Sequence, residues 1–170
     1  MISKERKRHD EHELFIKQAL HEAKKAARKG EVPIGAVIVL DNKIIARSHN
    51  LKETTADPTA HAEIIAIKKA SKKLKKWRLL NSTIYVTLEP CIMCMGALIQ
   101  ARVPRLVFGS YDPKAGACGS VYDVSNDKRL NHRIKTINGI MAVECERILK
   151  EFFKSLRRMQ NIGAMSQKSE

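Results

Sequence analysis

Apolar residues recur with three- and four-residue spacing in the first part of the chain. The stripe consists of Leu14, Ala19, Leu20, Ala23, Ala26 and Ala27. Lysines and arginines fill the other faces of the same segment, as in an amphipathic helix with one face toward a core. The pattern predicts a first helix that ends at Gly30.

Two runs rich in β-branched and aliphatic residues follow, at 36–40 and 44–48, on either side of Asp41-Asn42-Lys43. A short polar segment between two such runs is typical of a hairpin turn. We therefore expect two antiparallel strands. Next comes Asp57-Pro58, a capping side chain before a proline, which predicts the opening of a second helix that continues through residue 74.

The second half of the chain alternates between strands and helices. Residues 83–88 and 105–108 have strand composition, and between them Pro90 opens a helix through Ala101. A strand, a helix and a second strand in this order imply a parallel pair of strands. After a polar loop at 110–133, a fifth strand is expected at 134–137 and a closing helix at 142–159.

This order predicts an α/β fold, a three-layer α/β/α sandwich around a mixed five-stranded sheet. A length of 170 residues suits one domain, which we place at residues 1–160, with a flexible C-terminal tail at 161–170. No apolar stretch approaches the roughly 20 residues that span a bilayer. The polar N-terminus lacks a secretory signal, so we expect a cytoplasmic protein without membrane contact.

The net charge of the chain indicates a class of binding partner that the predicted fold does not. Its 32 Lys and Arg residues exceed its 18 Asp and Glu residues, for a formal net charge of +14. Such an excess attracts polyanions, although it can also serve solubility alone. One dense run is either a solvated helix face or a track for RNA phosphates, and comprises Lys68, Lys69, Lys72, Lys73, Lys75 and Lys76. Arg157 and Arg158 add to the excess near the end of the chain.

Three residues form a candidate metal site. Cys91 and Cys94 stand at positions i and i+3, so their sulfurs converge on one side of a first helical turn, where the helix dipole favours thiolates. His61, at the start of the preceding helix, supplies a third ligand. A His-Cys-Cys set suits Zn²⁺ and leaves the fourth position free for water, as in catalytic zinc sites.

Glu63 is the candidate proton carrier. It lies two residues after His61, which in the middle of a helix would point the two side chains apart. At the first turn both can reach past the helix end, so Glu63 can accept a proton from a zinc-activated water. The alternative is a structural zinc site closed by Cys118 or Cys145, with Glu63 as a solvated carboxylate. Otherwise Cys145 reads as a small core residue.

The pair of motifs His61-Ala62-Glu63 and Pro90-Cys91-Ile92-Met93-Cys94 is the signature of zinc nucleobase deaminases. From about Phe15 to Arg158 the chain resembles the bacterial tRNA-specific adenosine deaminase family, within the cytidine-deaminase-like superfamily. The segments that carry the resemblance are 31–37, 57–63, 85–91 and 131–133.

The resemblance implies deamination of adenosine to inosine at the wobble position of a tRNA anticodon stem-loop, by a homodimer with one zinc ion per subunit. It also implies that Asn50 hydrogen-bonds the base, that Ile34 and Ala62 form walls of its pocket, and that Phe153 contacts flanking nucleotides.

Two other functions compete with this one. The metal motif alone does not separate an RNA editor from a deaminase of a free base or nucleotide, such as cytosine, guanine or deoxycytidylate. The third hypothesis is a catalytically silent RNA-binding subunit that keeps zinc for structure. Such a subunit is expected to have lost its proton carrier, so the presence of Glu63 argues against it.

Overall fold

The structure is a computed structural model that describes residues 2–166 and the side chains of residues 6–161. Five strands form one sheet in the order β2-β1-β3-β4-β5. At its antiparallel side, β1 (Gly35–Leu40) pairs with both β2 (Lys43–His49) and β3 (Thr83–Leu88).

The other side of the sheet is parallel. β4 (Arg105–Ser110) pairs with β3, and β5 (Lys135–Ile137) pairs with β4. β3, α4 and β4 follow one another along the chain, and β3 and β4 form the parallel pair that the sequence predicts. The mixed five-stranded sheet is confirmed.

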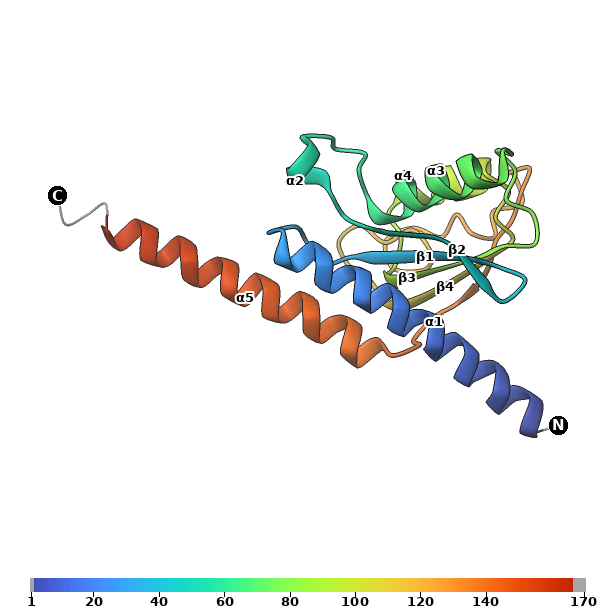
Figure 1. Ribbon diagram of the computed structural model, residues 1–170, viewed down its shortest axis with the longest axis horizontal. Helices are drawn as coiled ribbons and strands as arrows, with labels where there is room; N and C mark the ends of the chain where they lie inside the picture. The colour runs from blue at the N-terminus through green and yellow to red at the C-terminus, as the bar shows by residue number, and fades with distance from the viewer. Residues whose placement is uncertain (1, 167–170) are drawn as a thin grey trace.

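Helices cover both faces of this sheet (Figure 1). α1 (Ile2–Arg28) and α5 (Ala142–Ser166) lie on one face, and α3 (Ala62–Leu74) and α4 (Ile92–Gln100) lie on the other. The predicted three-layer α/β/α sandwich is therefore confirmed. No helix within residues 2–166 is long and apolar enough to cross a bilayer.

Burial explains why the central strands are almost continuously apolar. Ile38 and Ile84 pack into the core under α3 and α4, whereas Val37, Tyr85 and Val107 pack into a second core under α1 and α5. Because both faces of β1 and β3 are covered, successive residues that point to opposite faces are all buried. These strands hold the functional end of the molecule in place.

The hairpin turn between β1 and β2 has two residues, Asp41 and Asn42, with φ of 48° and 57°. Two successive positive φ values match the type I′ turn, whose twist suits a hairpin and which Asp and Asn tolerate. Lys43, expected in the turn, is the first residue of β2.

The predicted capping role of Asp57 is wrong. Its Oδ1 accepts hydrogen bonds from the Thr59 N–H at 2.8 Å and the Thr59 hydroxyl at 2.7 Å, so it closes a local turn. α3 begins later, at Ala62. A short helix, α2 (Lys52–Thr55), precedes this turn and was not predicted, because four residues are too few to show a helical period.

Both terminal helices are longer than predicted. α1 begins at Ile2, well before Leu14, through a highly charged segment without an apolar stripe. α5 continues past Met159 to Ser166, so part of the predicted tail at 161–170 is helical. Residues 167–170 lie outside the described residues, and the predicted single domain at 1–160 stays a prediction.

Gly35, at the start of β1, is expected to tolerate no side chain. A Cβ there would lie 2.0 Å from the Ala19 carbonyl oxygen and 2.5 Å from the Ala23 nitrogen, both backbone atoms of α1. Gly35→Ala should therefore lower the free energy of unfolding by about 1–3 kcal/mol or more. Urea unfolding measures the change.

Gly96, within α4, is the matched control. A Cβ at Gly96 meets nothing within 4 Å. Because alanine is the better helix former, Gly96→Ala should raise the free energy of unfolding by about 0.5–1 kcal/mol. Equal effects of the two substitutions would contradict the close contact between α1 and β1.

Candidate active site

The candidate site lies at the edge of the sheet where β2 and β3 end and, further along the chain, α3 and α4 begin. Ligand sites in open α/β sheets favour this edge. His61 immediately precedes α3 and Cys91 immediately precedes α4, both with extended backbone: φ and ψ are −75° and 152° at His61, and −72° and 172° at Cys91. Neither side chain caps its own helix. Both side chains are therefore available to a common ligand.

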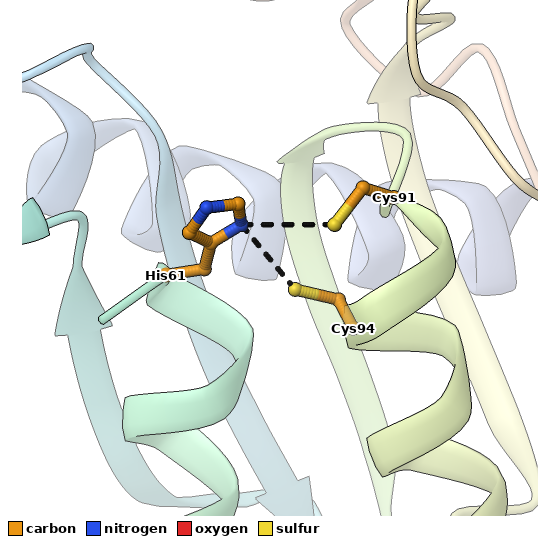
Figure 2. A group of neighbouring side chains, drawn as sticks. All are labelled: His61, Cys91 and Cys94. Atoms are coloured by element: carbon orange, nitrogen blue, oxygen red, sulfur yellow. Dashed lines mark hydrogen bonds between the residues drawn. The ribbon is translucent and has the colours of Figure 1, made fainter. Parts of the chain in front are cut away.

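The structure brings the three predicted metal ligands together (Figure 2). His61 Nδ1 lies 3.7 Å from Cys91 Sγ and 3.6 Å from Cys94 Sγ. All three ligand atoms lie within 4.8 Å of one another. Tetrahedral Zn²⁺ with Zn–S of about 2.3 Å and Zn–N of about 2.0 Å places nitrogen and sulfur about 3.5 Å apart. The spacing of this cluster therefore fits a metal ion of that size.

The pKa values of the two clustered cysteines shift in opposite directions. A hydrogen bond from the Cys94 thiol lowers the pKa of Cys91 to about 4, against the opposing effect of partial burial. Donating that bond raises the pKa of Cys94, and burial raises it further. The hydrogen bond to Cys91 also raises the pKa of His61. Cys91 is thus a thiolate at neutral pH, the form that binds metal.

Glu63 lies beside the cluster, as the first-turn geometry predicts. Its side chain is buried, with 4% of the residue surface exposed. Burial raises the pKa of Glu63, the charge of Cys91 raises it further, and His61 opposes the shift. A side-chain hydrogen bond with Cys94 also acts on the pKa of Glu63, so the carboxyl lies beside the metal ligands. A carboxyl with a raised pKa holds a proton more readily than an exposed one.

The two remaining cysteines lie apart from the cluster. Cys118 is buried, and its Sγ lies 3.1 Å from the Met95 sulfur. Cys145 is fully buried in the core beneath α1 and α5, so its interpretation as a core residue is confirmed. All four cysteines fall within the described residues, and none of them is in a disulfide. Within that part of the chain, the metal-ligand group contains three residues, so a tetrahedral ion held there would keep its fourth position for water.

The residues expected to contact substrate are arranged around this edge of the sheet. Ile34 and Phe153 line one groove of about 600 Å³, together with Val32, Leu88, Tyr111, Asp112, Pro113, Lys114, Leu149, Lys150 and Arg157. Phe153 is 40% exposed. Ala62 is fully buried at the start of α3, where its carbonyl accepts a 2.6 Å hydrogen bond from the Ser48 hydroxyl.

Asn50 is buried at the end of β2, and its backbone N–H donates to the Ile34 carbonyl at 3.0 Å. The next residue, Leu51, donates to the carbonyl of Ala60, which precedes His61. Asn50 therefore lies on the segment that joins the groove to the metal ligands.

Two buried carboxylates near the site were missed from the sequence. Glu31 bonds Asn50 and α2, and Glu89 lies two residues before Cys91. Glu89 accepts from the backbone N–H groups of Asp112 at 3.0 Å and Cys118 at 2.7 Å, and from Ser120. It therefore fixes the loop after β4 against the first metal-binding cysteine. A single acid in a loop has no spacing that signals such a role.

Comparisons with known proteins agree with this geometry. Residues 10–157 match the model of the MafB19-like deaminase family. A tRNA-specific adenosine deaminase from Bacillus subtilis is 49% identical over 86% of this chain and 91% of its own length.

Two solved structures are also similar. One, from a study of A-to-I editing by tRNA:A34 deaminases at the wobble position of transfer RNA, is 44% identical with a TM-score of 0.77, over 79% of this chain and 98% of that one. A guanine deaminase from Bacillus subtilis is also 44% identical, with a TM-score of 0.54, over 62% of this chain and 65% of that one.

The three-layer fold, with a His-Cys-Cys cluster and a buried glutamate at the start of two helices, defines the class of deaminases with a cytidine-deaminase-like fold. The similarity extends over most of both chains for the adenosine-specific relative and over less for the guanine deaminase. The chain belongs to the tRNA-specific adenosine deaminase family.

Proposed function

We propose that this enzyme hydrolyses adenosine to inosine and ammonia at the wobble position of a tRNA anticodon loop. The observation that carries the proposal is the His61, Cys91 and Cys94 cluster beside buried Glu63, in a chain that is 49% identical to a tRNA-specific adenosine deaminase. The cluster supports the hydrolytic chemistry, and the similarity supports the choice of tRNA adenosine as the substrate.

In this proposal His61, Cys91 and Cys94 hold one zinc ion per subunit. When bound, zinc lowers the pKa of a water molecule to about 7 and so makes a nucleophile available at neutral pH. Glu63 accepts the proton that this water loses on adding to C6 of the base. It would deliver that proton to N1 and then carry the proton of the new C6 hydroxyl to the amino group, so that the C6–N6 bond breaks and ammonia leaves.

The substrate is held by residues around the cluster. Asn50 hydrogen-bonds the base, Ile34 and Ala62 form walls of its pocket, and Phe153 contacts the flanking nucleotides. The position of Ile34 and Phe153 on one groove supports the last two roles. Burial of Ala62 against β2 supports a rigid wall close to the metal.

A homodimer is part of the same proposal. Exposed apolar side chains lie next to the metal ligands: Ile92 follows Cys91 and is 52% exposed, and Val121 and Tyr122 are exposed on the loop whose Gly116 pairs with Cys91. A second subunit would cover these side chains.

Light scattering should give twice the chain mass, and a monomer at micromolar concentration would refute the dimer. The expected location in the cytoplasm stays a prediction.

The function is tested by its products. Zinc-loaded protein is incubated separately with an anticodon stem-loop RNA, free adenosine, free cytidine and free guanine, and the products are separated by chromatography. We expect inosine within the RNA and little conversion of the free compounds. The guanine arm is needed because the chain is also similar to a guanine deaminase. Efficient turnover of a free base, with the RNA unchanged, would replace the proposal with the small-molecule alternative.

Salt dependence should separate RNA from small-molecule binding. Each phosphate contact releases counterions, so log affinity for a single-stranded loop falls with log salt by about 0.7 per contact. Free adenosine has no phosphate and should show almost no dependence. Arg157 lines the groove with Phe153, so Arg157→Ala should lower the slope by about 0.7. Fluorescence anisotropy at several salt concentrations measures it.

The lysine run provides the control for this experiment. Lys72, Lys73, Lys75 and Lys76 lie at the end of α3, whose 13 residues place them about 20 Å from His61. Replacing these four by alanine should change the slope less per residue than Arg157→Ala. A larger effect from the lysines would show that they form the phosphate track. Binding that is insensitive to salt in the parent protein would remove RNA as the ligand.

A further inference from the structure

Glu31 is a fully buried carboxylate between α1 and β1, with none of its surface exposed. It accepts hydrogen bonds from the side-chain amide of Asn50 at 3.1 Å and from the backbone N–H groups of Thr54 at 2.6 Å and Glu53 at 3.2 Å. Burial of a carboxylate is costly unless such donors replace water. Its three partners connect Asn50 to α2, on the segment that leads to His61.

Glu31 is ionised at neutral pH. Burial acts to raise the pKa of its carboxyl, but hydrogen bonds from Thr54 and Glu53 outweigh that effect and hold the pKa below its usual value. An ionised carboxylate has acceptor atoms and no donor. The hydrogen bond between Glu31 and Asn50 must therefore use an N–H of Asn50.

This requirement fixes the orientation of the Asn50 amide. An asparagine side chain can rotate by 180° and exchange its carbonyl oxygen with its NH₂ group, but a carboxylate partner permits one of the two arrangements. With one N–H donated to Glu31, the carbonyl oxygen and the second N–H of Asn50 remain for a substrate. On an amide the carbonyl oxygen lies beside the N–H that is cis to it, so pairing with a base at two points requires Glu31 to accept the other N–H.

We propose that Glu31 is a positioning residue that holds the Asn50 amide with an acceptor beside a donor, and so selects an adenine edge. This inference rests on the proposed role of Asn50 in binding the base. Adenine presents the N6 amino donor next to the N7 acceptor, which such an amide pairs with at two points. Guanine presents O6 and N7, both acceptors, so its O6 would face the carbonyl oxygen of Asn50.

The test compares two substrates in two proteins. One anticodon stem-loop carries adenosine at the edited position, and the other carries 7-deazaadenosine, in which a C–H replaces the N7 acceptor. In the parent protein kcat/KM should be about three- to tenfold higher for adenosine, the fold-change expected for one neutral hydrogen bond. In Glu31→Gln this ratio should fall toward one, because a glutamine amide can pair with either orientation of Asn50.

Glu22→Gln is the matched control. Glu22 is also a buried carboxylate, and it accepts from His49 at 3.0 Å and Lys25 at 2.6 Å without contact to Asn50. This variant should keep the parent ratio, even if it unfolds more easily. A parent ratio of one, or a Glu31→Gln variant that slows on both substrates with an unchanged ratio, would overturn the proposal. The second result would leave Glu31 a purely structural role.

The proposal can be tested independently of the RNA assignment and of the folding of the variant. If the parent acts on free adenosine instead, the same ratio is measured with free adenosine and free 7-deazaadenosine. If Glu31→Gln does not fold, the parent labelled with ¹⁵N in asparagine is compared with Asn50→Ala to assign the Asn50 amide. One of its protons should be strongly protected from exchange with solvent, whereas rapid exchange of both would overturn the proposal.

Discussion

Glu63→Gln is expected to retain its metal ion and its affinity for RNA while losing almost all deaminase activity. The substitution keeps the shape of the side chain and removes the carboxylate that carries protons. General acid and base catalysis raises reaction rates by about 10²- to 10⁴-fold, so kcat should fall by about 10²-fold or more. Single-turnover assays with the stem-loop RNA, together with metal analysis of the same sample, measure both quantities.

Glu146→Gln provides the control for that experiment. Glu146 lies on α5, where its exposed carboxylate pairs with Lys150 at 2.7 Å. Neutralising it should leave kcat within about twofold of the parent, because exposed ion pairs contribute little. Turnover near the parent level in Glu63→Gln would mean that another group moves the proton, and the mechanism would have to be abandoned.

Cys94→Ala is expected to release the metal. The variant keeps two of the three ligands, which are too few for a stable zinc site. Zinc measured by plasma emission should fall from about one ion per chain to nearly none. In the parent protein, zinc at 100 times its dissociation constant should stabilise the fold by about 2.7 kcal/mol, a stabilisation that a variant without the site cannot gain. Thermal unfolding of the variant should therefore no longer respond to added zinc.

Cys145→Ala and Cys118→Ala are the matched controls. Both remove a buried thiol, but neither thiol belongs to the metal-ligand group. Each variant should lose some packing energy and keep its zinc. Full zinc occupancy in Cys94→Ala, with loss of zinc in either control, would identify a different ligand and revive the structural-site alternative.

The sequence predicted best where the signal was local. Cys91 and Cys94 share one helical turn, so their spacing alone brings the sulfurs together. His61 directly precedes α3 and Glu63 lies in its first turn, as expected, whereas their roles as metal ligand and proton carrier stay predictions. The strands of the sheet followed from short apolar runs between turn residues, and their order followed from the strand, helix, strand connection.

The features that were missed depend on contacts between distant segments. Glu31 meets Asn50 and α2 only after β1 and β2 have paired, so its neighbours in the sequence give no indication of its partners. Asp57 is of a residue type that often caps helices, but its carboxylate accepts a hydrogen bond from Thr59 in a turn. The early start of α1 had no apolar period to reveal it.

The buried carboxylates have a consequence for ionic strength. Glu31, Glu63 and Glu89 are buried at the catalytic end, whereas the lysines and arginines that give the chain its charge of +14 lie mostly on the surface. Surface charges are screened beyond a Debye length of about 8 Å at physiological ionic strength, but buried charges are screened much less. Salt that releases a polyanion from the exterior should therefore leave the internal hydrogen bonds of Glu31 and Glu89, and the shape of the site that they hold, unchanged.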